Sequence, residues 1–281
     1  MNTIQLFSIA TKTWNTISYT GSFTARRLHV ATLYNNDVYV IGGCTSSSEI
    51  PLNDVVKFTI ATSTWSPISY TGTFPARWFH SVTLVNGDIY IIGGYNGYGT
   101  HFNDIRKFNI ATSIWTDVGY TGTFSAREGH SATLYNNLIY VIGGNYGSSS
   151  NKNDVLTFNI ATSVWTNIVY SGTFSARWAH TATLYNDAIY VIGGRIGTGT
   201  SNYNDVLMFI LATNTWVTIS PIGSYTPRGI HDTVLYNNII YFMDGSYANT
   251  AVLSDMYQMS LPLQGNNAIL LLYTTSLSLI T

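Results

Sequence analysis

The feature that most constrains this chain is a repeat of about fifty residues that returns along most of its length. Five tryptophans mark the repeat at intervals of 51, 50, 50 and 51 residues: Trp14, Trp65, Trp115, Trp165 and Trp216. An arginine column and a histidine column keep the same spacing: Arg26, Arg77, Arg127, Arg177 and Arg228, with His29, His80, His130, His180 and His231. A fixed period of this length is typical of a propeller-type array, in which each repeat packs on its neighbours.

Within a copy, the residues keep fixed offsets. In the stretch from Arg127 to Trp165, an apolar run ends in Gly143-Gly144, Asn153-Asp154 precedes the next apolar run, and Trp165 follows. This pattern resembles the Kelch repeat family over residues 2–261. The matching glycine pairs are Gly42, Gly43, Gly93, Gly94, Gly143, Gly144, Gly193 and Gly194. The resemblance implies a β-propeller, usually a platform for binding another protein, and only a minority of such relatives are enzymes.

Each copy contains four short apolar runs of strand type. In the first copy they are residues 26–34, 38–41, 55–60 and 64–68, which we label a, b, c and d. The runs are rich in β-branched and aromatic residues, and an Asn-rich pair such as Asn35-Asn36 separates a from b. Such residues tolerate positive φ, which tight hairpins require. The sequence predicts an all-β chain of four-stranded antiparallel blades.

The copies divide the chain into a half blade, five repeats and a divergent tail. The boundaries are 2–18, then 26–68, 77–118, 127–168, 177–219 and 228–261, then 262–281. We expect one propeller domain over residues 1–281, with six blades of which the last is completed by both chain ends. Five blades, or a fragment of a longer array, are the alternatives. The tail is expected to form two short strands, with the start of a membrane segment as the alternative.

Composition limits the class of partner. Charged residues make up 9% of the chain, the net charge is −1 and the pI is about 6.6, which argues against binding to nucleic acid or to an anionic membrane. Cys44 is the single cysteine, so thiolate metal sites are not expected. The N-terminus aligns with the repeat instead of a leader, and no Asn-x-Ser/Thr sequon occurs. Together these features predict a cytoplasmic protein without a cofactor.

The two ends of the blades differ in variability. The a-to-b and c-to-d turns are near copies, the latter reading I-A-T-K-T, I-A-T-S-T and similar, whereas the b-to-c loops differ in every blade. A surface that recognises an asymmetric partner must break the repeat symmetry. We therefore predict a binding face formed by the b-to-c and d-to-a loops.

Most charged and imidazole groups occupy repeat columns. The column arginine at the start of a and the column aspartate at the start of c lie at the same end of the blade, so they are predicted to pair and tie down the loops. Each of the five column histidines is predicted to be a structural group that bonds to a neighbouring backbone group. A metal site is not expected, because a five-fold ring is too wide for its members to reach one ion.

The remaining residues are candidates for partner binding. They follow the column arginine or lie in the b-to-c loops: Arg27, Trp78, Glu128, Trp178, Arg195, Tyr95, Tyr98, His101, Tyr146, Lys152 and Tyr203. Trp and Arg are enriched at binding hot spots, and exposed aromatic clusters usually mark contact surfaces. For the two tryptophans, packing between blades is the alternative. The predicted function is a non-catalytic protein-binding scaffold. The second hypothesis is a carbohydrate-binding propeller, and the third is an enzyme resembling the galactose-oxidase-like copper proteins, which need a tyrosine linked to a cysteine.

Overall fold

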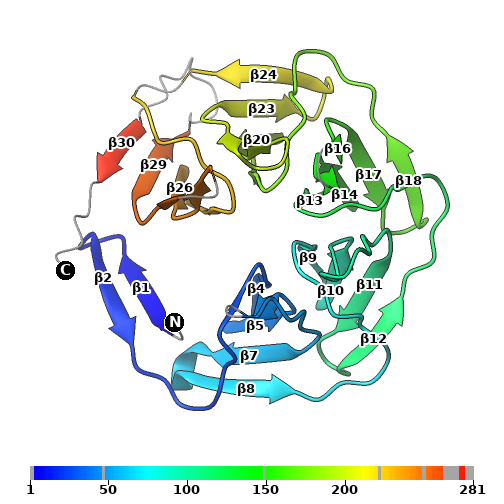
Figure 1. The fold of residues 1–281 in the computed structure, drawn as a ribbon, viewed down its shortest axis with the longest axis vertical. Helices are drawn as coiled ribbons and strands as arrows, with labels where there is room; N and C mark the ends of the chain where they lie inside the picture. Colours follow the sequence, from blue (N-terminus) through cyan, green and yellow to red (C-terminus); the bar gives the residue numbers. More distant parts are fainter. Residues whose placement is uncertain are drawn as a thin grey trace. The chain divides into compact units, whose positions relative to one another are not determined.

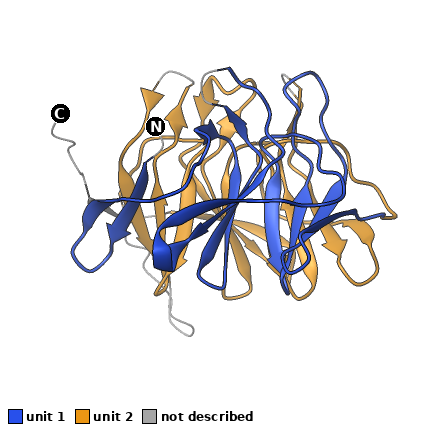
Figure 2. Cartoon of the chain, turned by 90° about the horizontal axis from the view of Figure 1, so that it is seen from below, with its two compact units in different colours: residues 1–119 blue, residues 120–281 orange. Residues whose placement is uncertain are grey.

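The structure is a computed structural model that describes residues 3–45, 48–147, 150–220, 223–248, 251–261 and 272–275. The chain forms two compact units, residues 1–119 and 120–281, shown in blue and orange in Figure 2. Both units consist of antiparallel strands, with one short 3-10 turn, η1 (Ile60–Thr62), in the described residues. No helix in this described part is long and apolar enough to cross a membrane.

Unit 1 contains two complete four-stranded blades and one strand pair (Figure 1). The pair is β1 (Ile4–Ser8) with β2 (Thr13–Ile17). Blade 1 consists of β4 (Val30–Tyr34), β5 (Asp37–Ile41), β7 (Val55–Thr59) and β8 (Thr64–Ile68). Blade 2 consists of β9 (Ser81–Val85), β10 (Asp88–Ile92), β11 (Ile105–Asn109) and β12 (Ile114–Asp117). A two-residue ladder, β3 (Arg26–Arg27) with β6 (Cys44–Thr45), lies at the b-to-c end of blade 1.

Unit 2 contains three four-stranded blades. Blade 3 consists of β13 (Ser131–Tyr135), β14 (Leu138–Ile142), β17 (Val155–Asn159) and β18 (Val164–Asn167). Blade 4 consists of β19 (Thr181–Tyr185), β20 (Ala188–Ile192), β23 (Val206–Ile210) and β24 (Thr215–Ile219). Blade 5 consists of β25 (Asp232–Tyr236), β26 (Ile239–Met243), β29 (Met256–Ser260) and β30 (Leu272–Thr275). Three short ladders lie at the b-to-c ends: β15 (Asn145–Tyr146) with β16 (Ser150–Asn151), β21 (Arg195–Ile196) with β22 (Ser201–Asn202), and β27 (Ser246–Tyr247) with β28 (Ala251–Val252).

The prediction of an all-β, Kelch-type propeller fold with four antiparallel strands per blade is confirmed. The five four-stranded sheets correspond to the five-blade alternative. The preferred six-blade arrangement, in which the tail and residues 2–18 complete one blade together, is not what the described residues show. Part of the tail, β30, pairs with β29 as the fourth strand of blade 5, while β1 and β2 form a two-stranded sheet. The rest of the predicted tail hairpin lies outside the described residues, and the single-domain assignment stays a prediction.

The core of each unit lies between successive blades. In unit 1, Tyr39 and Ile41 of blade 1 pack against Ile89 and Ile91 of blade 2. In unit 2, equivalent clusters join blade 3 to blade 4 and blade 4 to blade 5. Strands buried on both faces need apolar residues at every position, which explains the uninterrupted I-Y-V-I runs. Within each unit, the apolar b strands are therefore held by packing against the successive blade.

The tryptophan column is packed by the loop that enters from the preceding repeat. Phe174 stacks on Trp216 with ring centroids 4.4 Å apart and an interplanar angle of 9°. Gly172, in the same loop, has φ +80°, and a Cβ there would lie 2.2 Å from the carbonyl oxygen of Trp216. Only glycine allows that approach. Phe74 with Trp115 and Phe124 with Trp165 repeat the stacking, so these three tryptophans pack in the same way.

Candidate functional site

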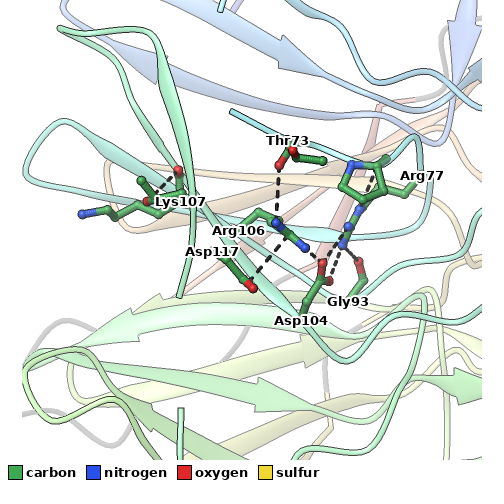
Figure 3. A network of polar contacts seen from close by, with 9 residues as sticks. Thr73, Arg77, Gly93, Asp104, Arg106, Lys107 and Asp117 are labelled. Atoms are coloured by element: carbon green, nitrogen blue, oxygen red, sulfur yellow. Dashed lines mark hydrogen bonds and ion pairs between the residues drawn. The ribbon is translucent and has the colours of Figure 1, made fainter. Parts of the chain in front are cut away.

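The column arginines form buried clamps at the b-to-c end of each blade. Figure 3 shows the clamp of blade 2, in which Arg77 donates to the carbonyl oxygen of Gly93 at 2.9 Å and to both carboxylate oxygens of Asp104 at 2.6 and 2.9 Å. Burial would raise the pKa of Asp104, but hydrogen bonds and charge from Arg77 and Arg106 lower it. Arg106 in turn lies 3.8 Å from Asp117 (Figure 3). The clamp therefore ties the start of strand a to the start of the b-to-c loop and to the start of strand c.

All five blades repeat this clamp, which confirms the predicted Arg–Asp pairing. The guanidinium groups are buried, and each donates to the carbonyl oxygen of the first residue of the glycine pair. Blade 5 has Asp244 in place of that glycine, and Arg228 still donates to its carbonyl oxygen at 2.8 Å. The other pairs are Arg26 with Asp54, Arg127 with Asp154, Arg177 with Asp205 and Arg228 with Asp255.

The column histidines of blades 2 to 5 are buried, whereas His29 of blade 1 is exposed, and the bonds shown for His180 and His231 are to side-chain hydroxyls instead of the predicted backbone groups. In unit 2, Ser131 Oγ lies 3.0 Å from His180 Nε2, and Thr181 Oγ1 lies 3.0 Å from His231 Nε2, so each bond links one blade to the next. Burial, followed by the charge of the column arginine, lowers the pKa of both imidazoles from 6.5 to about 3. They are neutral structural groups. The described residues contain no cluster of three or more His, Cys, Asp or Glu side chains that could hold a metal ion.

Beyond each clamp lies a short ladder that we call the crown. It is formed by the residue after the column arginine, the two residues after the glycine pair, and the residues that pair with them at the end of the b-to-c loop. Sequence analysis predicted one continuous a strand through this region. Instead the chain turns at Leu28, Phe79, Gly129, Ala179 and Ile230, all with φ between 51° and 61°.

The turn residue has no recognisable sequence signal, because its conformation is imposed by the neighbouring blade. The Ala179 N–H donates to the Gly129 carbonyl oxygen at 2.6 Å, and the Ile230 N–H donates to the Ala179 carbonyl oxygen at 2.9 Å. A β-branched residue such as Ile230 adopts positive φ only when surrounding contacts compensate for its strain. These two hydrogen bonds connect the turns of blades 3, 4 and 5 within unit 2.

Three of the predicted partner-binding residues are buried, contrary to the exposure expected of them: Trp78, Trp178 and Arg195. Trp178 Nε1 donates to the Gly197 carbonyl oxygen at 3.2 Å, and the Arg195 guanidinium carbon lies 5.2 Å from the Trp178 ring centroid. Arg195 also donates to Ser246 Oγ at 2.7 Å. Trp78 packs edge-on against Tyr95 with centroids 5.6 Å apart. Packing, the alternative considered for the tryptophans, describes their positions.

The other candidates are spread over the blades. Tyr203 covers the clamp of blade 4, with the Arg177 guanidinium carbon 3.9 Å from its ring centroid. Tyr95 and His101 lie together with centroids 4.5 Å apart. Burial raises the pKa of Glu128 to about 7, and burial followed by the charge of Arg127 lowers the pKa of Lys152. The exposed members are Arg27, which pairs with Glu49, together with Tyr98 and Tyr146.

To the predicted Tyr146 the structure adds two exposed residues that sequence analysis missed, Ile196 and Tyr247. Tyr146, Ile196 and Tyr247 occupy the same crown position in blades 3, 4 and 5, with exposed fractions of 53%, 36% and 41%. We call these three residues the crown row. Strand alternation explains the pattern, because the preceding residues Asn145 and Arg195 are buried. The sequence position could have indicated this exposure, because all three residues are the second one after the glycine pair or its equivalent.

The chain matches the protein family described as the KLHDC2/KLHL20/DRC7 Kelch-repeats domain, over residues 1–144 and 79–264. It is 33% identical over 96 residues to Kelch domain-containing protein 3 of Bos taurus, covering 33% of this chain and 25% of that protein. It is 35% identical over 79 residues to tRNA wybutosine-synthesizing protein 2/3/4 of Oryza sativa subsp. japonica, covering 28% of this chain and 8% of the relative. It is 31% identical over 91 residues to Leucine-zipper-like transcriptional regulator 1 homolog of Drosophila melanogaster, covering 31% of this chain and 9% of that protein. The chain thus matches at most a quarter of the length of these relatives.

Proposed function

Since this chain belongs to the Kelch-repeat family, we propose that it is a non-catalytic scaffold that binds another protein through the crowns of unit 2. Propellers of this family commonly serve as protein-interaction scaffolds. The observation that carries the proposal is the crown row: three apolar or aromatic side chains, Tyr146, Ile196 and Tyr247, exposed at the same position of three successive blades. Aromatic side chains present large contact area at low conformational cost and are enriched at interfaces.

A hydrogen-bonded layer beneath the crown row supports this role. In this partly buried layer, Arg195 donates to Ser246 Oγ of the next blade, and Asn202 Nδ2 donates to the Ser246 carbonyl oxygen at 3.2 Å. Asn202 Oδ1 also accepts from the Ala248 N–H at 2.9 Å. A surface that is already ordered loses little conformational entropy when a partner binds. The crown row is therefore well suited to form the centre of an interface.

The proposal is tested by comparing two sets of substitutions in the full chain. The triple variant Tyr146→Ser, Ile196→Ser and Tyr247→Ser removes the crown row, and Ile60→Ser removes an exposed apolar side chain from η1, at the c-to-d turn. We expect a protein retained from source-cell lysate by the wild type and by Ile60→Ser to be lost with the triple variant. Once identified and purified, that protein should bind the wild type directly with the same dependence.

A contrary result would change the functional class. If the triple variant retains every partner of the wild type, the crown row is not the interface. If no protein is retained but immobilised glycans are, the carbohydrate-binding hypothesis takes precedence. Because Trp178 is buried, a glycan site on the crowns of unit 2 would use Tyr146 and Tyr247 as stacking surfaces, and Tyr146→Ser would then weaken glycan binding.

A further inference from the structure

Blade 2 contains the two Asn-Gly dipeptides of the chain, Asn86-Gly87 and Asn96-Gly97. An asparagine before glycine can lose its side-chain amide, because a glycine nitrogen has no neighbouring Cβ to hinder its attack on the side-chain carbonyl carbon. Asn86-Gly87 forms the a-b turn between β9 and β10, whereas Asn96-Gly97 lies in the crown, between β10 and β11. Since the two dipeptides are identical, any difference in their reactivity within the protein comes from the fold.

The crown loop of blade 2 holds the Asn96 side chain in place. Asn96 Oδ1 accepts hydrogen bonds from the Tyr98 N–H and the Thr100 N–H, both at 2.9 Å. The Asn96 N–H donates to the Thr100 carbonyl oxygen at 3.0 Å, which closes the loop. The bond from Tyr98 to Oδ1 completes a ring of atoms that contains both Asn96 Cγ and the Gly97 nitrogen. The ring limits how far these two atoms can separate.

The fold also leaves the Gly97 nitrogen unhindered. Gly97 has φ +78°, and a Cβ there would lie 2.3 Å from Cη2 of the buried Trp78 ring, so a larger residue would collide with that ring. Within the described residues, the Gly97 N–H donates no hydrogen bond. A base can therefore remove its proton without first breaking a bond inside the protein.

We propose that Asn96 is a self-modification site, at which the chain deamidates its own side chain. The Gly97 nitrogen, after losing its proton to hydroxide, bonds to Asn96 Cγ, and the electron pair of the C=O bond moves to Oδ1. The two N–H groups that already bond Oδ1 stabilise this charge, as donors in an oxyanion hole do. The Cγ–Nδ2 bond then breaks, and ammonia leaves with a proton from water. Water opens the resulting succinimide to aspartate or isoaspartate, so one water is consumed for each ammonia released.

The two products change the crown of blade 2 in different ways. An aspartate at residue 96 adds a negative charge and keeps an oxygen that accepts from Tyr98 and Thr100. Isoaspartate also inserts a CH2 group into the backbone, so the pairing of residue 96 with Thr100 cannot be kept. Tyr98, which is 74% exposed at the tip of this loop, is then displaced. Deamidation therefore alters the charge of this surface and, in the isoaspartyl product, also its shape.

Asn86 lacks the arrangement found at Asn96. It lies in a two-residue hairpin turn with φ 49°, and no hydrogen bond to its side chain is present in the part of the chain that the structure describes. A negative charge developing on its Oδ1 has water as its donor. We therefore expect Asn86 to deamidate more slowly than Asn96 in the folded protein, which makes it a matched internal control.

The test follows both asparagines in the intact protein and in the unfolded chain. The wild type is incubated in heavy-oxygen water at mildly alkaline pH, with and without urea, and chymotryptic peptides, which separate the two sites at Tyr90, are analysed by mass spectrometry. In the folded protein, label should enter residue 96 about tenfold faster than residue 86, because the two N–H donors are in place. In urea the two rates should become equal, since the donors are then lost. Equal rates in the folded protein, or faster labelling of residue 86, would overturn the proposal.

One variant tests the role of the donors directly. Thr100→Pro removes an N–H that bonds Asn96 Oδ1, and should slow labelling of residue 96 several-fold while residue 86 keeps its rate. If this variant melts like the wild type and labels residue 96 at the wild-type rate, the donors have no part in the reaction. If it does not fold, the comparison of folded and unfolded wild type still decides the question. The triple crown variant should deamidate like the wild type, so this proposal and the proposed function fail independently.

Discussion

The clamp and the crown of a blade are adjacent in sequence but differ in how much their residues vary between blades. Arg177 is a clamp residue and repeats in all five blades, while Trp178 is the next residue and its equivalents are Arg27, Trp78, Glu128 and Gly229. The clamp residue binds the backbone carbonyl of its own blade, which every blade needs. The crown residue pairs through its backbone, so its side chain is free to vary.

The difference teaches that variability and exposure are separate properties. The crown has two layers of different accessibility, a buried one with Trp178 and Arg195, and an exposed one with Ile196. Both layers vary between blades. Only the exposed layer can contact a partner directly, and the buried layer holds it in place.

The largest effect expected concerns the histidine column and tests whether the repeated positions are strictly structural. The pKa values of His80, His180 and His231 are lowered from 6.5 to about 3, chiefly by burial. Between these values the unfolded chain binds more protons than the folded chain, so stability is present above pH 6.5 and falls as the pH falls. At pH 5 each histidine should cost about 2 kcal/mol, or about 6 kcal/mol together.

Urea unfolding at pH 7.5, 6 and 5 measures this loss. A total near 6 kcal/mol is comparable to the stability of a typical domain, so the protein should be largely unfolded near pH 5. A stability that does not change between pH 7.5 and 5 would show that the column histidines are accessible and charged in the folded state.

The second prediction compares two arginines, one in a clamp and one in a crown. Arg177→Met leaves Asp205 without its bidentate partner, and should lower the free energy of unfolding by about 4 kcal/mol. Arg27→Met removes an exposed ion pair with Glu49 and should change the free energy of unfolding by less than about 0.5 kcal/mol. Chemical denaturation of both variants at pH 7.5 gives the comparison. Equal effects would mean that clamp and crown arginines contribute alike.

The third prediction concerns the buried layer of the crown. Trp178→Ala removes a ring that packs under Arg195 and donates to Gly197, and should cost about 3 kcal/mol of stability. The measurement is the same denaturation experiment, with Tyr98→Ala as an exposed aromatic control. A change within about 0.5 kcal/mol would instead identify Trp178 as a contact residue with no structural role.

The smallest effect is expected for the crown row. Tyr146→Ser, Ile196→Ser and Tyr247→Ser should each lower the free energy of unfolding by about 1 kcal/mol or less, because between 36% and 53% of each residue's surface is already exposed. Thermal melts of the three single variants test this. A large loss of stability in any of these variants would place that side chain in the buried layer and argue against its role in the proposed interface.

Much of the fold could be predicted from residue patterns. The turn residues Asn35-Asn36 and Asn136-Asn137 have the positive φ values that the hairpins require. The Arg–Asp pairs were predictable because strand direction brings the start of a and the start of c to one end. The assignment of the tail to a sixth blade with residues 2–18 failed because strand pairing at the ends is not periodic, and β30 joined blade 5 instead.

The candidate site was predicted less well. Tyr146 was identified as an aromatic loop residue, but Ile196 was passed over in favour of its neighbour Arg195. An arginine in a loop is usually exposed, and nothing near Arg195 in sequence indicates that Trp178 and Ser246 enclose it. Composition ranks residues by type, whereas accessibility depends on which neighbours cover them.

The sequence by itself determined the repeat, the strand order within a blade, the clamps and the uniform turns, because each of these follows from contacts that recur at a fixed separation along the chain. Only the tertiary structure decided the left-handed turn at Ala179 and Ile230, the burial of Trp178 and Arg195, and the exposure of the crown row. The turns and the contact of Arg195 with Ser246 depend on a neighbouring blade about fifty residues away, and at such distances packing overrides local preference.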